Sequence, residues 1–156
     1  MSPESTKRQL LDEAGEWLAG GTPEAGSRLL ETLRDAAEQA RARAYAPYSN
    51  YAVGAALLGE DGVVYTGCNV ENASYGATIC AERGAIAQMV AGGGRRALVC
   101  LVIGSGSTAV SPCGPCRQVL AEFNTPFVVS VGPDGGLRSW TMEQLLPDAM
   151  SRDDLA

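Results

Sequence analysis

The stretch "ALVCLVIG", residues 97–104, is a continuous apolar run with the length of one β-strand. A strand with one wet face alternates apolar and polar residues, whereas an uninterrupted apolar run is typical of a strand covered on both faces. We therefore expect a central strand in a sheet with helices packed on each side.

The chain before this strand shows two helical patterns, a hairpin and a third helix. The first helix begins at Ser2-Pro3-Glu4 and ends at "GGTPEAGS", residues 20–27. The second is entered near Thr22-Pro23 or Ser27 and ends by Pro47. The apolar runs 51–58 and 63–70 flank an Asp-Gly turn, which predicts a β-hairpin, and residues 80–91 form a helix that ends at a glycine run.

The chain after the central strand predicts a short helix over residues 116–123, a strand over 127–131 and a turn over 133–136. A short strand fits after that turn, and Thr141 to Gln144 match a capping box that opens a last short helix. This order predicts an α/β fold, a three-layer α/β/α sandwich with a mixed five-stranded sheet.

Length and composition suit one compact domain, since the chain has 156 residues of which 46% are hydrophobic. We expect residues 1–27 to form an N-terminal accessory helix or extension, and residues 28–156 to form the functional domain. The net charge of -6 disfavours a polymeric nucleic acid as partner, so a small molecule fits better. No signal peptide or membrane span is visible, which predicts a cytoplasmic protein with reduced cysteines.

The chain contains no histidine. This excludes Ser-His and Cys-His nucleophiles and any histidine-ligated zinc site. Metal ligands must then come from Cys, Asp and Glu.

Cys113 and Cys116 are separated by two residues in "SPCGPCRQVL", residues 111–120. This spacing alone leaves three interpretations open: a thioredoxin-like redox dithiol, part of a metal site, and coincidence. Cys80 and Glu82 stand at the predicted start of another helix, and together with Pro112 and the cysteine pair they match a Cys-x-Glu and Pro-Cys-x-x-Cys zinc-deaminase signature.

Cys80, Cys113 and Cys116 are therefore the candidate ligands of Zn2+. Helix N-termini lower thiol pKa values and stabilise the thiolates that bind zinc. Three protein ligands leave one tetrahedral position for water, which is the mark of a catalytic site. Arg83 and Arg117 each follow a motif residue, and we expect them to offset the negative charge of the thiolates.

Glu82 distinguishes the alternatives, because a carboxylate beside the metal can move protons and a redox dithiol has no use for one. The competing interpretation is an exposed carboxylate in the first helical turn, stabilised by the helix dipole by ~0.3–1 kcal/mol. We expect Glu82 to be the catalytic residue.

Blocks beyond the metal motifs resemble cytidine deaminase of the small homotetrameric type over residues 29 to 155. They are "YAPYSNYAVGAALL", "GCNVENASYG", "TICAERGAI", "SPCGPCRQVLAEF" and "LLPDAM", in that family's order and spacing. The resemblance implies zinc-dependent deamination of cytidine or deoxycytidine to the uridine product and ammonia, in pyrimidine salvage.

The resemblance also implies roles for individual residues. Asn69 and Glu71 fall where the family holds the ribose hydroxyls, and the backbone amide of Ala81 falls where it contacts the pyrimidine carbonyl. Tyr75 matches an aromatic residue that reaches a neighbouring subunit's site. A homotetramer with composite active sites is implied.

Two positions depart from the family pattern. Tyr51 replaces a Phe that stacks on the pyrimidine, which adds a hydroxyl, and Met150 replaces a second Phe contributed across the interface. A more adaptable pocket could accept a modified aminopyrimidine nucleoside such as blasticidin S, whose deaminase has a block similar to residues 111–120.

Cys68 and Cys100 fall in predicted strands, and we expect them to be buried free thiols. In the alternative, one of them completes a structural zinc site with four cysteines, which would be a binding module without catalysis. The helix over residues 80–91 is apolar almost all round, which fits burial on both sides or a subunit interface.

Overall fold

The computed structural model describes residues 2–23 and 26–156, so residues 24 and 25 of the predicted break lie outside the described residues. A five-stranded mixed sheet has the order β2-β1-β3-β4-β5. β1 (Val53–Gly59) pairs antiparallel with β2 (Val64–Cys68) and with β3 (Ala97–Gly104), which is the middle strand. β4 (Phe127–Val131) runs parallel to β3, and β5 (Leu137–Thr141) is antiparallel to β4.

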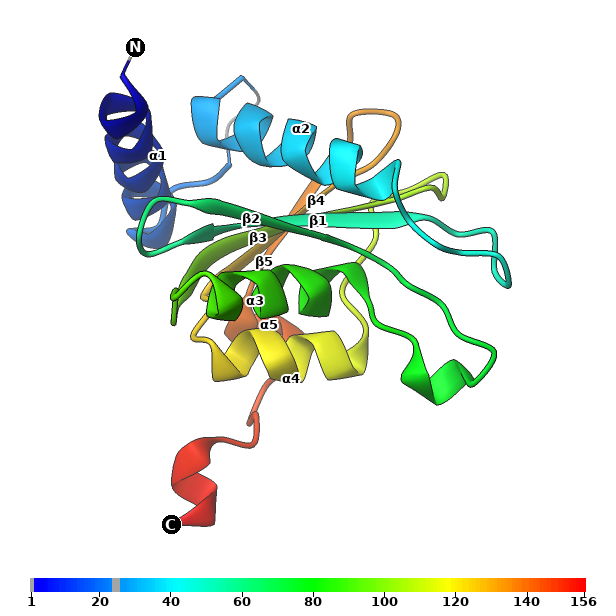
Figure 1. Ribbon diagram of the computed structural model, residues 1–156. Helices are drawn as coiled ribbons and strands as arrows, with labels where there is room; N and C mark the ends of the chain where they lie inside the picture. Colours follow the sequence, from blue (N-terminus) through cyan, green and yellow to red (C-terminus); the bar gives the residue numbers. More distant parts are fainter. Residues whose placement is uncertain (1, 24–25) are drawn as a thin grey trace.

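Helices cover both faces of this sheet (Figure 1). One face packs against α1 (Pro3–Leu18) and α2 (Arg28–Arg41), and the other against α3 (Ala81–Ala91), α4 (Gly114–Glu122) and α5 (Met142–Leu145). Short 3-10 turns follow at Tyr75–Ala77 and Arg152–Leu155. The α/β/α sandwich and its five strands confirm the prediction made from the apolar run at 97–104.

Strand alternation divides the core between the two faces. Ala56 and Leu58 of β1 face α1 and α2, whereas Ala55 and Leu57 face α3. Because β3 is buried on both faces, its side chains contribute to both clusters, which accounts for its unbroken apolar sequence.

Helix starts follow local capping chemistry. Ser2 caps α1 and Ser27 caps α2, so the second helix begins at the later of the two predicted starts. Thr141 and Gln144 form the predicted capping box at α5. α4 begins at Gly114, two residues before the predicted start, so that Cys113 becomes its N-cap.

Two glycines allow helices to lie directly on the sheet. A Cβ at Gly67 would overlap the Ala81 carbonyl and the Ala85 amide of α3, and a Cβ at Gly54 would overlap the Ala37 carbonyl of α2. The first of these contacts brings the N-terminal turn of α3 onto β2. Close backbone approach of this kind is one reason that a strand interior carries glycine.

The N-terminal helix α1 belongs to the core of its own chain. Leu10, Ala14 and Trp17 are buried beside α2 and the sheet. The Glu13 carboxylate also accepts the Leu29 N–H at 2.7 Å, which satisfies a backbone donor in the first turn of α2.

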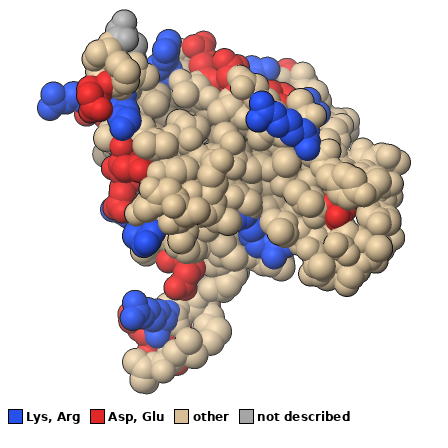
Figure 2. All heavy atoms as spheres, in the orientation of Figure 1, with Lys and Arg blue, Asp and Glu red and all other residues tan. Residues whose placement is uncertain are grey.

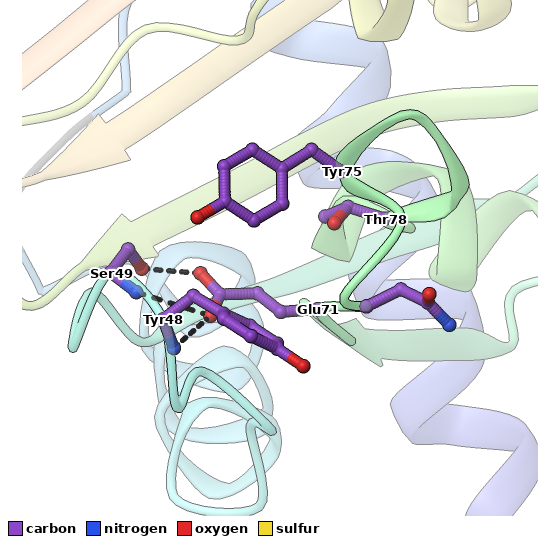
Figure 3. Close-up of a pocket in the computed structure, with 6 residues that line it drawn as sticks. Tyr48, Ser49, Glu71, Tyr75 and Thr78 are labelled. Atoms are coloured by element: carbon purple, nitrogen blue, oxygen red, sulfur yellow. Dashed lines mark hydrogen bonds between the residues drawn. The ribbon is translucent and has the colours of Figure 1, made fainter.

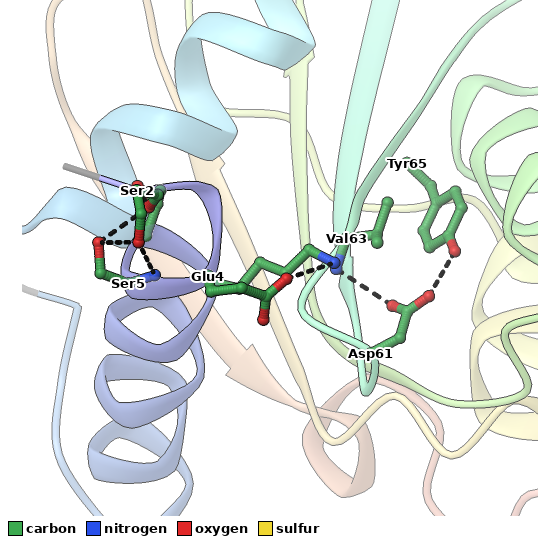
Figure 4. Close-up of polar contacts among 8 residues, drawn as sticks. Ser2, Glu4, Ser5, Asp61, Val63 and Tyr65 are labelled. Carbon is green, nitrogen blue, oxygen red and sulfur yellow. Dashed lines mark hydrogen bonds and ion pairs between the residues drawn. The ribbon is translucent and has the colours of Figure 1, made fainter.

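The outer face of α1 lies near the β1–β2 turn (Figure 4), where Gly62 approaches the side chain of Lys7. Asp61 in this turn accepts the Val63 N–H at 3.1 Å and the Tyr65 hydroxyl at 2.6 Å. The hydrogen bond to Asp61 raises the pKa of Tyr65. In the described part of the chain, no helix has the length and apolar character needed to cross a membrane.

We predict that Trp17→Ala lowers the free energy of unfolding by about 3–5 kcal/mol, because the indole is only 4% exposed and its loss leaves a cavity beside Phe127. Urea unfolding followed by circular dichroism measures the change. Leu18→Ala is the matched control: its side chain is 37% exposed, and we expect a loss of about 0.5 kcal/mol or less. Equal losses for the two variants would show that α1 does not pack as described.

Candidate active site

Three cysteine thiols converge where α3 and α4 begin. Cys80 is the N-cap of α3, Cys113 is the N-cap of α4, and Cys116 lies in the first turn of α4. The three sulfurs lie within 4.8 Å of one another, and those of Cys80 and Cys113 are 3.7 Å apart. Two sulfurs bound to one tetrahedral zinc at 2.3 Å stand about 3.8 Å apart, so the spacing fits this metal.

Sheet geometry explains the convergence. The chain leaves β3 at its carboxyl end and reaches α4, and it leaves β2 at the same edge and reaches α3, because both strands are antiparallel to β1. Both helices therefore begin at one edge. Their N-terminal partial charges stabilise thiolates, which are the ligands that zinc requires.

The cluster lowers the pKa of Cys80 to about 5, chiefly through its hydrogen bond to Cys116 and further through Arg83. The same interaction with Cys80 raises the pKa of Cys116. The neighbouring thiols and Arg83 therefore favour the thiolate form of Cys80. This donor set fits a soft divalent cation such as zinc.

The two candidate compensating arginines differ in position. A terminal nitrogen of Arg83 lies 3.9 Å from the Cys80 sulfur and donates to the Thr78 carbonyl at 2.6 Å. Arg117 instead donates to the carbonyls of Pro112 and Leu145, both at 2.8 Å, which ties the loop before α4 to α5. Within residues 2–23 and 26–156, we find no hydrogen bond from Arg117 to a cluster thiol.

Glu82 is buried beside this cluster, with 4% of its surface exposed. Burial raises the pKa of its carboxyl, and the neighbouring negative charge of Cys80 adds to this effect. The alternative of an exposed first-turn carboxylate is therefore wrong. Glu82 does not belong to the candidate ligand set, which consists of the three cysteine sulfurs, and this position fits a residue that carries protons.

Cys100 and Cys68 lie apart from the three-thiol cluster. Cys100 is fully buried in the core of β3, as expected, whereas Cys68 at the end of β2 is only partly buried. Burial raises the pKa of Cys100 well above its usual value. Among the described residues, no fourth potential ligand joins Cys80, Cys113 and Cys116, which argues against a closed four-cysteine site.

A pocket of about 380 Å³ opens on this side of the molecule, lined by Tyr48, Ser49, Glu71, Asn72, Tyr75 and Thr78 (Figure 3). Glu71 is its one acidic group. The Glu71 carboxylate accepts the Tyr48 N–H at 2.8 Å, the Ser49 N–H at 3.2 Å and the Ser49 hydroxyl. The bond from the Ser49 hydroxyl is the main cause of its lowered pKa. The carboxylate is therefore held ionised in one orientation.

Asn69 is buried behind this pocket and is engaged with backbone. Its amide oxygen accepts the Val53 N–H and its amide nitrogen donates to the Tyr51 carbonyl, both at 2.8 Å. These bonds fix the entry to β1. The side chain of Tyr51, just before β1, places its hydroxyl close to Gly104 and Gly106. A side chain at either glycine would collide with the Tyr51 ring.

The remaining predicted site residues are two exposed side chains and one backbone amide. Tyr75 is 75% exposed and packs edge-on against Tyr48, with ring centroids 5.8 Å apart. Met150 is 59% exposed in the C-terminal segment, where its carbonyl accepts from Gln118. Ala81 is buried at the first position of α3, which places its amide beside the cysteine cluster.

Ser49 and Thr78 carry functions that the sequence did not reveal. Ser49 holds Glu71, and the Thr78 carbonyl holds Arg83. Both lie inside blocks that the family resemblance covers, but a serine in a polar loop or a backbone carbonyl has no spacing signature. Only contact across the fold identifies them.

The sandwich and its three-thiol, one-carboxylate centre define the class of zinc-dependent deaminases. A family model described as the cytidine and deoxycytidylate deaminase zinc-binding region matches residues 27–131, and the chain belongs to this family.

Named relatives agree with this assignment. The chain is 44% identical over 129 residues to a cytidine deaminase of Sporosarcina psychrophila, covering 81% of this chain and 95% of that protein. It is 46% identical over 123 residues to one from Mycobacterium tuberculosis, covering 79% and 90%. The crystal structure of a Burkholderia pseudomallei cytidine deaminase matches with a TM-score of 0.73 and 47% identity, covering 77% of this chain and 98% of that one.

We predict that Cys80→Ser removes the bound zinc, because the serine hydroxyl does not supply the thiolate that the site needs. Cys68→Ser and Cys100→Ser are matched controls, since both cysteines lie outside the cluster. Zinc per chain, measured by mass spectrometry of the purified proteins, should fall only for Cys80→Ser. Loss of zinc from a control variant would place that cysteine in the metal site.

Proposed function

We propose that this protein catalyses the zinc-dependent hydrolysis of cytidine and deoxycytidine to uridine or deoxyuridine and ammonia. The observation that carries the proposal is the juxtaposition of three thiols with the buried Glu82 carboxylate. Membership of the family, and relatives that are themselves cytidine deaminases, support the substrate class.

Cys80, Cys113 and Cys116 would hold the zinc. When bound, zinc supplies a Lewis acid that makes water nucleophilic near neutral pH. Arg83 is the arginine whose position fits charge compensation at the thiolates. Arg117 is assigned a positioning role instead, because its guanidinium holds the loop that carries Cys113.

Glu82 is assigned to proton transfer. Its carboxylate would take a proton from the attacking water and deliver it to the ring nitrogen N3. A second proton would pass through the same carboxylate to the departing amine, so that cytidine and water give uridine and ammonia. The raised pKa of Glu82 suits this task, because a carboxyl with a pKa nearer to neutrality can both accept and release a proton.

Glu71 and Asn69 are assigned to the ribose. The Glu71 carboxylate can accept hydrogen bonds from sugar hydroxyls, and its three bonds to Tyr48 and Ser49 hold it in place for this. The Asn69 amide keeps one N–H free of its two backbone contacts and can donate to a hydroxyl. The Ala81 N–H would contact the pyrimidine carbonyl and the Tyr51 ring would lie against the base.

We further propose a homotetramer with composite sites. Tyr75 and Met150 are exposed in the single chain and would be covered by, or contribute to, a neighbouring subunit. We assign residues 1–27 as an N-terminal extension, whose helix α1 packs into the core, and residues 28–156 as the deaminase domain. A cytoplasmic location and a place in pyrimidine salvage fit the free thiols and the nucleoside substrate.

A modified aminopyrimidine nucleoside is the second candidate substrate. It is favoured by the two departures from the family pattern, the added hydroxyl of Tyr51 and the flexible side chain of Met150. Ultraviolet absorbance with cytidine, deoxycytidine and blasticidin S, each at the same concentration, would rank the substrates. Preference for blasticidin S would replace the primary proposal.

We predict that Glu82→Gln lowers kcat for cytidine by about 10²- to 10⁴-fold, because an amide cannot carry the proton. Its zinc content and melting temperature should match those of the unmodified protein. Glu60→Gln, which changes an exposed turn, should keep full activity. Substantial deaminase activity in Glu82→Gln would refute the assignment.

We predict that the assembly has four times the 16.2 kDa mass of one chain, because the exposed rim residues need a covering subunit. Light scattering during size-exclusion chromatography measures this mass. A monomer with full deaminase activity would rule out composite sites.

A further inference from the structure

A second cavity, of about 250 Å³, lies on the opposite side of the sheet from the thiols. It is bounded by Arg34, Glu38 and Arg41 of α2, and by loops that follow the carboxyl ends of β3 and β4. These two strands are parallel neighbours. In α/β sheets, the loops at the carboxyl ends of parallel strands are the usual place for ligands.

The lining of this cavity is basic, although the whole chain carries a net charge of -6. Arg34, Glu38 and Arg41 recur at helical spacing along α2 and therefore share one face of the helix. In Figure 2, basic and acidic groups lie side by side along the left and upper edges of the visible face, while much of its centre and right is uncharged. Two guanidinium groups and one carboxylate leave a net positive charge at the cavity.

The two arginines differ in how far they are neutralised. Arg41 pairs with Glu38, with N–O distances of 2.8 Å from both Nε and a terminal nitrogen. Arg34 has no carboxylate oxygen within 4.0 Å among the residues that the structure describes. Arg34 is thus the group with unused charge, and its planar fork of donors suits a phosphate.

The loop after β3 allows close backbone approach. Gly104, Ser105 and Gly106 line the cavity, and the Gly106 N–H has no hydrogen-bond partner in residues 2–23 and 26–156. A side chain at either glycine would point toward Tyr51, so the backbone itself forms this wall of the cavity. Gly132 lines the opposite wall after β4.

This loop is held in place from its other side. The Ser105 N–H donates to the Ala52 carbonyl at 2.9 Å, and the Ala52 N–H donates to the Ser105 hydroxyl at 3.0 Å. The Tyr51 hydroxyl packs against Gly104 and Gly106. The cavity is therefore pre-formed by contacts that do not involve its own lining arginines.

We propose that this cavity binds a phosphate group, either as free phosphate or as the phosphate of a nucleotide. Arg34 supplies the main charge, Arg41 a second donor, and Gly106 a backbone N–H. Glu38 weakens binding because its carboxylate neutralises Arg41 and repels the anion. The proposal is independent of the deaminase activity, because binding is measured directly.

The test is isothermal titration calorimetry of the zinc-loaded protein with inorganic phosphate, at ionic strength held constant with chloride. We expect saturable binding with a Kd on the order of 1 mM. Arg34→Gln should weaken it by about tenfold or more, whereas Glu38→Gln should tighten it several-fold. Arg28→Gln, an exposed position on α2 outside the cavity, is the matched control and should bind like the unmodified protein.

Two further titrations separate the sources of the phosphate. If adenosine 5′-phosphate binds more tightly than inorganic phosphate and adenosine does not bind, the ligand is a nucleotide. Equal affinities would identify free phosphate. Absence of saturable phosphate binding, or equal affinities of Arg34→Gln and Arg28→Gln, would overturn the proposal, and unchanged cytidine turnover without phosphate shows that each variant is folded.

Discussion

The contact between the first turn of α3 and β2 sets the geometry of the metal centre. Gly67 has no side chain, so the backbone of Ala81 and Ala85 can rest directly on the strand. With α3 this close, Cys80 comes within 3.7 Å of Cys113 at the start of α4. A side chain at position 67 would separate the helix from the sheet, and the separation would be transmitted to the thiols because a helix moves as a rigid body.

Burial divides two glutamates into different chemical roles. Glu82 is enclosed beside the thiols, and desolvation raises the pKa of its carboxyl. Glu71 stands in an open pocket and accepts three hydrogen bonds from Tyr48 and Ser49, which lower its pKa. One carboxyl is thereby suited to carrying a proton and the other to remaining an ionised acceptor. Their environments, and not their side-chain chemistry, make the difference.

The loop over residues 104–106 has two sides with different surroundings. On one side it contacts Tyr51 beside the proposed nucleoside pocket, and on the other it lines the basic cavity below α2. The loop makes both contacts because it begins at the end of β3, where the chain leaves the sheet between the two helical layers. Glycine at 104 and 106 meets the constraint on the Tyr51 side, since a larger side chain there would collide with the ring.

The sequence by itself determined the order of the strands and helices, the three candidate ligands and Glu82, because periodicity, turn signals and motif spacing can be identified in the chain alone. The tertiary structure alone decided that Glu82 is buried and that the Ser49 hydroxyl donates to Glu71. It also decided that the Asn69 amide bonds the backbone at the entry to β1, and that Arg117 donates to the Leu145 carbonyl. These contacts join residues far apart in the chain. They depend on sheet register and on how closely each helix approaches the sheet, and neither quantity is encoded in a local pattern.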